Sequence, residues 1–360
     1  MLTVYRSRLP IAFLTLLGLA AWSGPVRAAD LEAGRQTFES VCAACHGTTG
    51  RPDPDNPVVQ ALDPEPADLS DPLFNSREPA SDWHVVVTHG GPALGLSAAM
   101  PAQGAVLSEK QIEDVVAYAK TLADTSGYPP GELNFFLPIR TKKAYPEDEI
   151  VWKSRYSDQA GRDVWRNVLE IEKRFGKRSM GLVEIVHEDD GTDSEISEVE
   201  IGVKTALHWS LEKRSILSGA IVLAIPTDSD ASEELIPYLA FGKQFSDKAL
   251  IEGSTRVIVP LDHADEGEVE FAGILYYVWT ERPRAIFPGL EMIATVPFDD
   301  EGGDPVKWTA LPQLRFGLTK GAHVALNLGV EFPLNDQSWD TRYHLTLLWD
   351  FADGSLFKGW

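Results

Sequence analysis

Cysteine, methionine and long apolar runs are scarce in this chain of 360 residues. It has two cysteines and four methionines. If both cysteines serve one site, no thiol remains for a structural disulfide or a thiolate metal cage. Beyond the first 28 residues, no segment approaches the roughly 20 consecutive apolar residues that a transmembrane helix needs. Basic residues are outnumbered, 32 against 54 acidic ones, which gives a formal net charge of −22. This charge excludes nucleic acid as a partner, because phosphates would be repelled.

Both cysteines belong to one motif. Cys42 and Cys45 are followed at once by His46, a spacing typical of the attachment site of a c-type haem. In such a site the two thiols bond the porphyrin and the histidine ligates the iron. A chance match or a redox-active cysteine pair is the alternative, and the surrounding sequence argues against both. The motif predicts one covalently attached haem c.

The amino terminus has the pattern of an export signal. Arg6 and Arg8 precede an apolar run over residues 11–22, and small residues follow at 26–28. We therefore expect a signal peptide over residues 1–28. Because haem c is attached after export in bacteria, the signal peptide and the haem motif support each other.

Residues 29–125 resemble a class I cytochrome c. A segment with helical spacing carries Gly34 and Phe38 into the haem motif, and a second helix is predicted to begin at Ser108 with a capping box. In the family, the last helix crosses the first at a contact between a glycine and an aromatic ring. The resemblance assigns these roles to Gly34, Phe38 and Tyr118, and implies an all-α haem domain.

The resemblance also implies a second iron ligand. The family places an axial methionine shortly before its last helix, where Met100 precedes Pro101 in this chain. A methionine that fills a gap in the core is the alternative. With His46 and Met100 both bound, iron would have no open position for a substrate, and Met/His ligation raises the reduction potential. The domain is therefore expected to be an electron carrier and not an enzyme.

The chain changes character after the haem domain. A Pro/Gly-rich stretch opens the poorly periodic segment 126–148, which is interpreted as a linker. Beyond it, apolar and ionic residues alternate with a period of two over runs of about ten residues, as in 324–332. Short basic turns and long acidic loops connect these runs in strict alternation. This plan is typical of an antiparallel outer-membrane β-barrel.

The last of these strands carries the most specific signal. Tyr343, Leu345, Leu347, Trp349 and Phe351 alternate down to a terminal aromatic residue, which resembles the C-terminal assembly signal of outer-membrane barrels. Eleven strands are clear, and a weaker one at 150–156 would make twelve. The predicted barrel covers residues 149–352, followed by a tail at 353–360.

Two strands contain a proline, Pro288 and Pro312, which weakens their prediction. An even strand count places both chain ends in the periplasm, with the haem domain on the side of the short basic turns. Twelve strands should enclose a narrow, partly occupied pore. A whole cytochrome would not fit inside it.

Taken together, the chain resembles the fused cytochrome-porins that move electrons across bacterial outer membranes. The resemblance implies an exported outer-membrane protein whose periplasmic haem domain exchanges electrons with a periplasmic carrier and with a donor or acceptor at the outer face. An extracellular metal ion or a basic redox protein is a candidate partner, because acidic loops would attract either.

Two alternatives remain open from the sequence. One is a small-solute outer-membrane channel with a tethered redox cytochrome. The other is a soluble periplasmic electron carrier with a β-sandwich domain, whose strands would also alternate between a packed face and a wet face.

Overall fold

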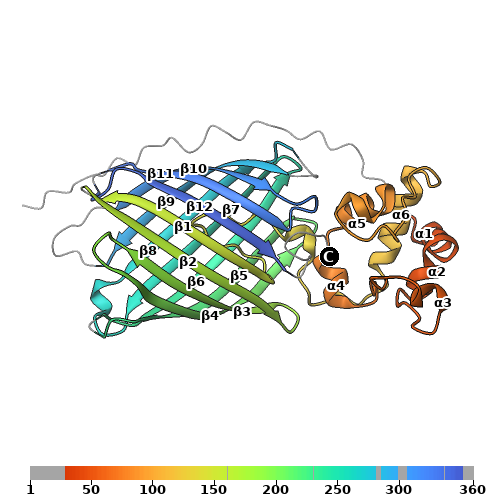
Figure 1. Cartoon of the computed structure of the whole chain (residues 1–360), viewed down its shortest axis with the longest axis horizontal. Helices are drawn as coiled ribbons and strands as arrows, with labels where there is room; N and C mark the ends of the chain where they lie inside the picture. The colour runs from red at the N-terminus through yellow and green to blue at the C-terminus, as the bar shows by residue number, and fades with distance from the viewer. Residues whose placement is uncertain are drawn as a thin grey trace, which may run out of the picture.

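The computed structural model describes residues 29–159, 161–229, 231–280, 285–298, 306–335 and 337–351. The predicted signal peptide (1–28) and tail (353–360) lie outside the described residues. A helical domain lies at one end of a β-barrel, and the two are joined by a segment that enters the barrel (Figure 1). Within the described residues, no helix is long and apolar enough to cross a membrane.

The helical domain is built from short helices around the crossing of its first and last ones. The helices are α1 (Leu31–Thr37), η1 (Phe38–Cys42), α2 (Ala43–His46), α3 (Pro57–Gln60), α4 (Pro72–Arg77), α5 (Ala80–His89), η2 (Gly91–Ala93), α6 (Glu109–Lys120) and η3 (Gly131–Leu133). Helix α6 begins with the predicted capping box between Ser108 and Gln111. Its buried residues pack on Phe38 and Trp83 in one apolar core.

Gly34 lies where α1 crosses α6, as the sequence predicts. A Cβ atom at Gly34 would lie 2.1 Å from the Asp114 carbonyl oxygen and 2.9 Å from Cβ of Tyr118. The rings of Phe38 and Tyr118 meet beside this point, with centroids 5.5 Å apart. The helices can approach this closely because Gly34 has no side chain.

Gly34→Val is therefore expected to destabilise the helical domain by about 3 kcal/mol or more, since the added atoms meet backbone that cannot move aside. Chemical denaturation followed by far-ultraviolet circular dichroism of the helical signal measures this loss. Ala33→Val places a valine in the same helix at a half-buried position and should cost under about 1 kcal/mol. Equal stability of the two variants would contradict the crossing.

The barrel is closed, because the first strand pairs with the last. Twelve antiparallel strands follow one another in chain order around it. They are β1 (Glu149–Gln159), β2 (Arg162–Phe175), β3 (Ser179–Asp189), β4 (Ser194–Ser210), β5 (Ser215–Pro226), β6 (Glu234–Ser246), β7 (Ala249–Pro260), β8 (Glu268–Tyr277), β9 (Ile286–Pro297), β10 (Lys307–Gly317), β11 (Val324–Pro333) and β12 (Arg342–Asp350). The predicted count of twelve is confirmed, and a closed barrel rules out the β-sandwich alternative.

Along the strands an apolar outer face alternates with a buried inner face, which is ionic in some strands and apolar in others, such as β5. In β2, Leu169 and Ile171 are 40% and 41% exposed, whereas Glu170 and Glu172 are 3% and 6% exposed. The prolines at 288 and 312 lie within β9 and β10 without ending them, although the β10–β11 ladder is interrupted next to Pro312. The inner face is therefore unusually rich in charge for a buried surface.

The helical domain rests on the barrel end that carries the short turns. The Lys320 ammonium, in the turn between β10 and β11, donates a hydrogen bond of 2.9 Å to the Pro92 carbonyl. The Lys177 ammonium, between β2 and β3, lies 5.6 Å from the centre of the Tyr128 ring. The helical domain therefore lies beside the short basic turns, and its placement in the periplasm stays a prediction.

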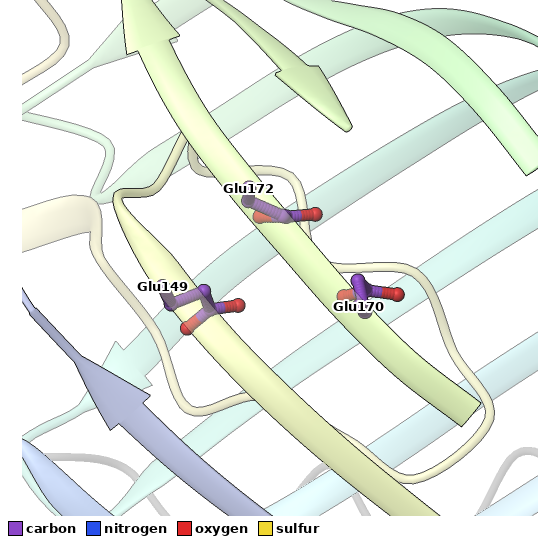
Figure 2. Close-up of side chains that lie close together, drawn as sticks. All are labelled: Glu149, Glu170 and Glu172. Carbon is purple, nitrogen blue, oxygen red and sulfur yellow. The ribbon is translucent and has the colours of Figure 1, made fainter. Parts of the chain in front are cut away.

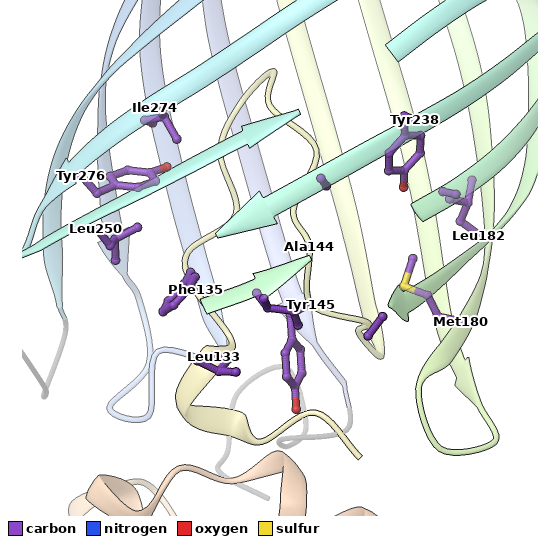
Figure 3. Packing of buried hydrophobic residues seen from close by; sticks show 14 of the residues in the cluster. Leu133, Phe135, Ala144, Tyr145, Met180, Leu182, Tyr238, Leu250, Ile274 and Tyr276 are labelled. Atoms are coloured by element: carbon purple, nitrogen blue, oxygen red, sulfur yellow. The ribbon is translucent and has the colours of Figure 1, made fainter. Parts of the chain in front are cut away.

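The segment interpreted as a linker does more than connect the two domains. Residues 134–148, here called the plug, run into the barrel, turn and return to β1 (Figure 3). Phe135, Leu137 and Ile139 are each at most 8% exposed. The Leu137 carbonyl accepts hydrogen bonds from the Tyr276 hydroxyl at 3.2 Å and the Asn327 amide at 2.7 Å. The expected partly occupied pore is thus occupied by the chain's own backbone.

Candidate functional site

The predicted haem motif lies at the junction of η1 and α2. Cys42 ends the π-helical turn η1, and Cys45 and His46 lie on the single turn of α2. Both thiols are free and half-buried. Burial, and then the neighbouring Cys45, raise the pKa of Cys42 to about 11. The two thiols are therefore held on one short helical stretch beside the apolar core.

The imidazole of His46 is oriented by the backbone. Its Nδ1 lies 3.1 Å from the Ala67 carbonyl oxygen, which can only accept, so Nδ1 carries the proton and Nε2 is left as a ligand. Burial lowers the pKa of His46, and the bond to Ala67 opposes this shift. The ring is therefore kept neutral, the form that binds a metal.

Met100 lies on a loop that is fastened to the end of α5. The Gly91 amide donates to the Met100 carbonyl at 3.0 Å. Gly90 has a φ of +81°, and a Cβ atom there would lie 3.1 Å from the same oxygen. Glycine is needed at this position for both reasons. The side chain is half-buried, and its role as second iron ligand stays a prediction.

The apolar core beside the motif suits a porphyrin. Phe38 and Trp83 are 1% and 7% exposed, and Cys42 packs against the cluster to which they belong. Thiols, a neutral imidazole and an apolar wall are the donor set and surroundings that a haem c requires. The residues of this domain therefore fit the group that the sequence motif predicts.

Met100→Ala is expected to lower the haem reduction potential by an amount on the order of 0.2 V, well within the range of about 0.8 V that axial ligands span. The sulfur-to-iron absorption band should disappear with it. Redox titration of the purified protein measures the first effect and absorption spectroscopy the second. Met180→Ala, in the barrel, is the matched control, and an unchanged band in Met100→Ala would refute the assignment.

A second constellation of polar groups anchors the plug tip inside the barrel. The Arg140 guanidinium donates to Glu270 at 2.6 Å and to Glu331 at 3.2 Å. The backbone amide and hydroxyl of Thr141 both donate to Glu291, the hydroxyl at 2.5 Å. These three glutamates come from β8, β9 and β11. The plug tip is therefore tied to one side of the wall by charge-assisted hydrogen bonds.

The other side of the plug is tied to the opposite wall. Lys142 forms an ion pair of 2.8 Å with Glu184 of β3. Lys204 of β4 donates to the Lys143 carbonyl at 3.2 Å, and the Ser218 hydroxyl of β5 donates to the Ala144 carbonyl at 2.5 Å. The plug thus bridges the lumen from β3–β5 to β8–β11.

The base of the plug is packed by aromatic rings. Phe136 stacks on Phe287 with centroids 3.7 Å apart, and its edge meets the Tyr276 ring at 6.1 Å. The Tyr145 hydroxyl donates to the Pro129 carbonyl at 3.0 Å, next to the helical domain. Figure 3 shows Tyr145 and Leu133 at the mouth and Tyr276 deeper in the barrel. The lumen is therefore filled by packed rings near the helical domain and by ion pairs further in.

Three carboxylates meet where β1 and β2 lie side by side. Oxygen atoms of Glu149, Glu170 and Glu172 lie within 4.8 Å of one another (Figure 2). The cluster has its own counter-charges: Lys153 lies 2.5 Å from Glu170, and Lys204 lies 3.6 Å from Glu172. Glu170 and Glu172 are therefore part of the ion-pair network of the lumen.

Sequence reasoning found the haem motif but missed the plug. The missed residues are Arg140, Thr141, Lys142 and Lys143. One signal was available, since residues 135–139 form a continuous apolar run in a segment otherwise interpreted as a linker. The basic residues that follow could have been matched to the surplus of inward-facing glutamates in the predicted strands.

In comparisons of the whole chain with known proteins, a family model and a curated relative match its N-terminal part. Residues 29–118 match the family model of cytochrome c oxidase, cbb3-type, subunit III. A cytochrome c6 from Synechococcus is 33% identical over 116 residues, which cover 31% of this chain and 89% of the relative.

Solved structures match the barrel part. A KdgM porin is 14% identical with a TM-score of 0.42, covering 56% of this chain and 99% of that chain. An outer membrane channel from Pseudomonas putida F1 is 12% identical with a TM-score of 0.43, covering 59% of this chain and 99% of that chain.

Proposed function

Because the chain belongs to the cytochrome c family through its N-terminal domain, we propose that it transfers electrons at the bacterial outer membrane. In this proposal the barrel spans the membrane and the haem domain lies in the periplasm. There it exchanges electrons between a periplasmic carrier and a donor or acceptor that reaches the barrel from outside. One observation carries the proposal: a haem-motif domain docks on the short-turn mouth of a closed barrel in the same chain.

The barrel's surface supports its place in a membrane. Large apolar side chains on the outer face stay exposed on many strands, among them Ile201, Ile221, Leu239, Leu275 and Leu290, at 44–61%. A soluble domain of this size would bury such a belt, because contiguous exposed apolar surface is costly in water. Closure pairs the strands all the way round, which is the condition for a sheet to cross lipid.

The haem domain supports electron transfer over catalysis. Cys42 and Cys45 would hold the porphyrin, while His46 and Met100 would be the protein ligands of the iron. When bound, haem c supplies a one-electron centre. The chain's own residues keep the imidazole neutral through burial, fix its orientation through Ala67 and cover the motif with apolar side chains. Such a site exchanges electrons without opening a position for substrate.

The plug bears on how the outer partner is reached. The apolar band of such a barrel is about 25 Å tall, and the helical domain lies outside the barrel at one mouth (Figure 1). Since the plug fills part of the lumen, a partner from outside would meet the plug and not the haem domain itself. The plug and its aromatic base then lie between that partner and the haem.

The second candidate is a small-solute channel with a tethered cytochrome. A cavity of about 270 Å³ beside the plug favours it, because a solute could pass there if the plug moved. Against it, the plug is held by ion pairs on both sides of the lumen. An open pore would need these pairs to separate.

The test uses the full haem-loaded chain in proteoliposomes, with orientation determined by protease digestion of the haem domain. Hexaammineruthenium(II), an impermeant one-electron reductant, is added on the long-loop side of vesicles whose haem is in the oxidised state, and haem absorbance is followed. We expect the haem to change oxidation state while sucrose swelling of the vesicles stays at background. Haem that responds only on the short-turn side, together with fast swelling, would favour the channel.

A further inference from the structure

The cavity beside the plug is lined by more basic than acidic side chains. Eight lysines and arginines line it, against four glutamates, whereas the whole chain has 32 basic and 54 acidic residues. It extends from the plug tip to β1 and β2 and has a volume of about 270 Å³. A small cavity with an excess of cationic side chains concentrates anions.

Arg155 of β1 is the group in this cavity whose charge lacks a partner. Its register places it directly opposite Arg166 of β2 on one side and His344 of β12 on the other. Like charges that face each other across strands are destabilising. Its Nε atom is buried and has no hydrogen-bond partner. Among the residues that the structure describes, no carboxylate forms an ion pair with Arg155.

The neighbouring cations already have partners. Arg166 pairs with Glu188 at 2.6 Å and with Glu198 at 3.6 Å. Both terminal nitrogens of the Arg140 guanidinium form ion pairs with carboxylates of the barrel wall. Their counter-ions are thus engaged, and none is directed at Arg155.

Arg174 and Arg315 also lie in the lumen without an ion pair to a described carboxylate, and Arg315 donates a hydrogen bond of 3.3 Å to Asn327. They differ from Arg155 in two respects. Arg174 and Arg315 lie over the rings of Tyr145 and Phe136, at 5.5 and 5.9 Å, and neither lines the cavity. Aromatic faces stabilise those two charges. Arg155 has no such ring contact among the described residues and faces open space.

We propose that this cavity binds a small oxyanion, a carboxylate or phosphate compound, with Arg155 as its principal contact. The planar guanidinium presents two parallel N–H donors, a geometry that matches a carboxylate or phosphate group. His344 and Lys153 lie next to Arg155 on the cavity wall. The site is independent of the electron-transfer proposal, because binding requires neither haem nor an electron partner.

Isothermal titration of the full haem-loaded chain in detergent micelles tests the site, with citrate and inorganic phosphate as separate probes. We expect saturable binding of at least one probe. Arg155→Gln should weaken the binding at least tenfold. Arg155→Lys keeps the charge but loses the two parallel N–H donors, so its affinity should lie between those of the wild type and Arg155→Gln. A higher salt concentration should weaken binding in the wild type and in each variant that binds a probe.

The matched control is Arg162→Gln. Arg162 lies on the next strand, is 64% exposed and pairs with Asp190 away from the cavity, so binding should be unchanged. The absence of saturable binding for both probes, or equal affinity in the wild type and Arg155→Gln, would overturn the proposal. Heat-modifiable migration in gels establishes that each variant is folded, and Arg155→Lys keeps the test decisive if Arg155→Gln does not assemble. Citrate binding without phosphate binding would identify carboxylates as the ligand class, and the reverse would identify phosphates.

Discussion

Replacing Arg140 by alanine is expected to open the barrel to ions. The change removes the ion pairs to Glu270 and Glu331 at once, and a hydrogen bond to a charged group contributes about 1.5–3 kcal/mol. The barrel wall keeps its own partners, since Arg256 also binds Glu270 at 2.8 Å and His344 binds Glu331 at 2.9 Å. The loss should therefore fall on the seating of the plug and not on closure of the barrel.

A loss of about 3 kcal/mol would raise the population of an unseated plug roughly 100-fold, since 1.4 kcal/mol corresponds to a factor of ten. Single-channel recording in planar bilayers should then show frequent openings that are rare in the wild type. Arg214→Ala, in a short turn where Arg214 pairs with Asp247, removes the same charge outside the lumen and should leave conductance at the wild-type level.

The expected result distinguishes two roles of the plug. If openings appear in Arg140→Ala, the ion pairs keep the pore closed, and the second candidate function would require a signal that breaks them. If Arg140→Ala and the double variant with Glu291→Gln both stay closed, the aromatic base around Phe136 and Phe287 is sufficient to seal the lumen, and the anchoring role assigned to Arg140 is wrong.

The outer architecture could be predicted because it depends on local pattern. Alternation in β2, where Leu169 and Ile171 face outward and Glu170 and Glu172 inward, is visible in any ten-residue window. A closed barrel follows when such windows are joined by alternating short turns and long loops. The crossing of α1 and α6 at Gly34 was likewise expected from the resemblance, and the structure confirms it.

The plug could not be predicted in the same way, because its stabilising contacts are not local. Arg140 binds carboxylates 130 and 191 positions away in the chain. On its own, the segment shows prolines, glycines and charges, which are typical of a linker. The plug could have been inferred only from charge balance. Strands that turn several glutamates inward need cations inside the barrel, and the segment interpreted as a linker is basic at its centre.

Replacing His46 by alanine is expected to have the largest effect on function. The change removes the protein ligand that Ala67 orients and that burial keeps neutral. Haem would then be held by its thioether bonds and by Met100 as the one remaining protein ligand of the iron, so the low-spin absorption spectrum should be lost and haem attachment during maturation reduced. Electron transfer in proteoliposomes should fall to the level of vesicles without protein.

Controls separate this loss from a failure to fold. His89→Ala removes an exposed histidine at the end of α5 in the same domain, and spectrum and transfer should be unchanged. The barrel of His46→Ala should still migrate in its heat-modifiable form, because the barrel is closed by the pairing of β1 with β12, to which the motif residues do not belong. Full electron transfer by a correctly assembled His46→Ala protein would mean that electrons do not pass through this haem site. Background transfer with unchanged solute flux would instead show that the two halves of the chain have separable tasks, with the haem domain carrying the electrons.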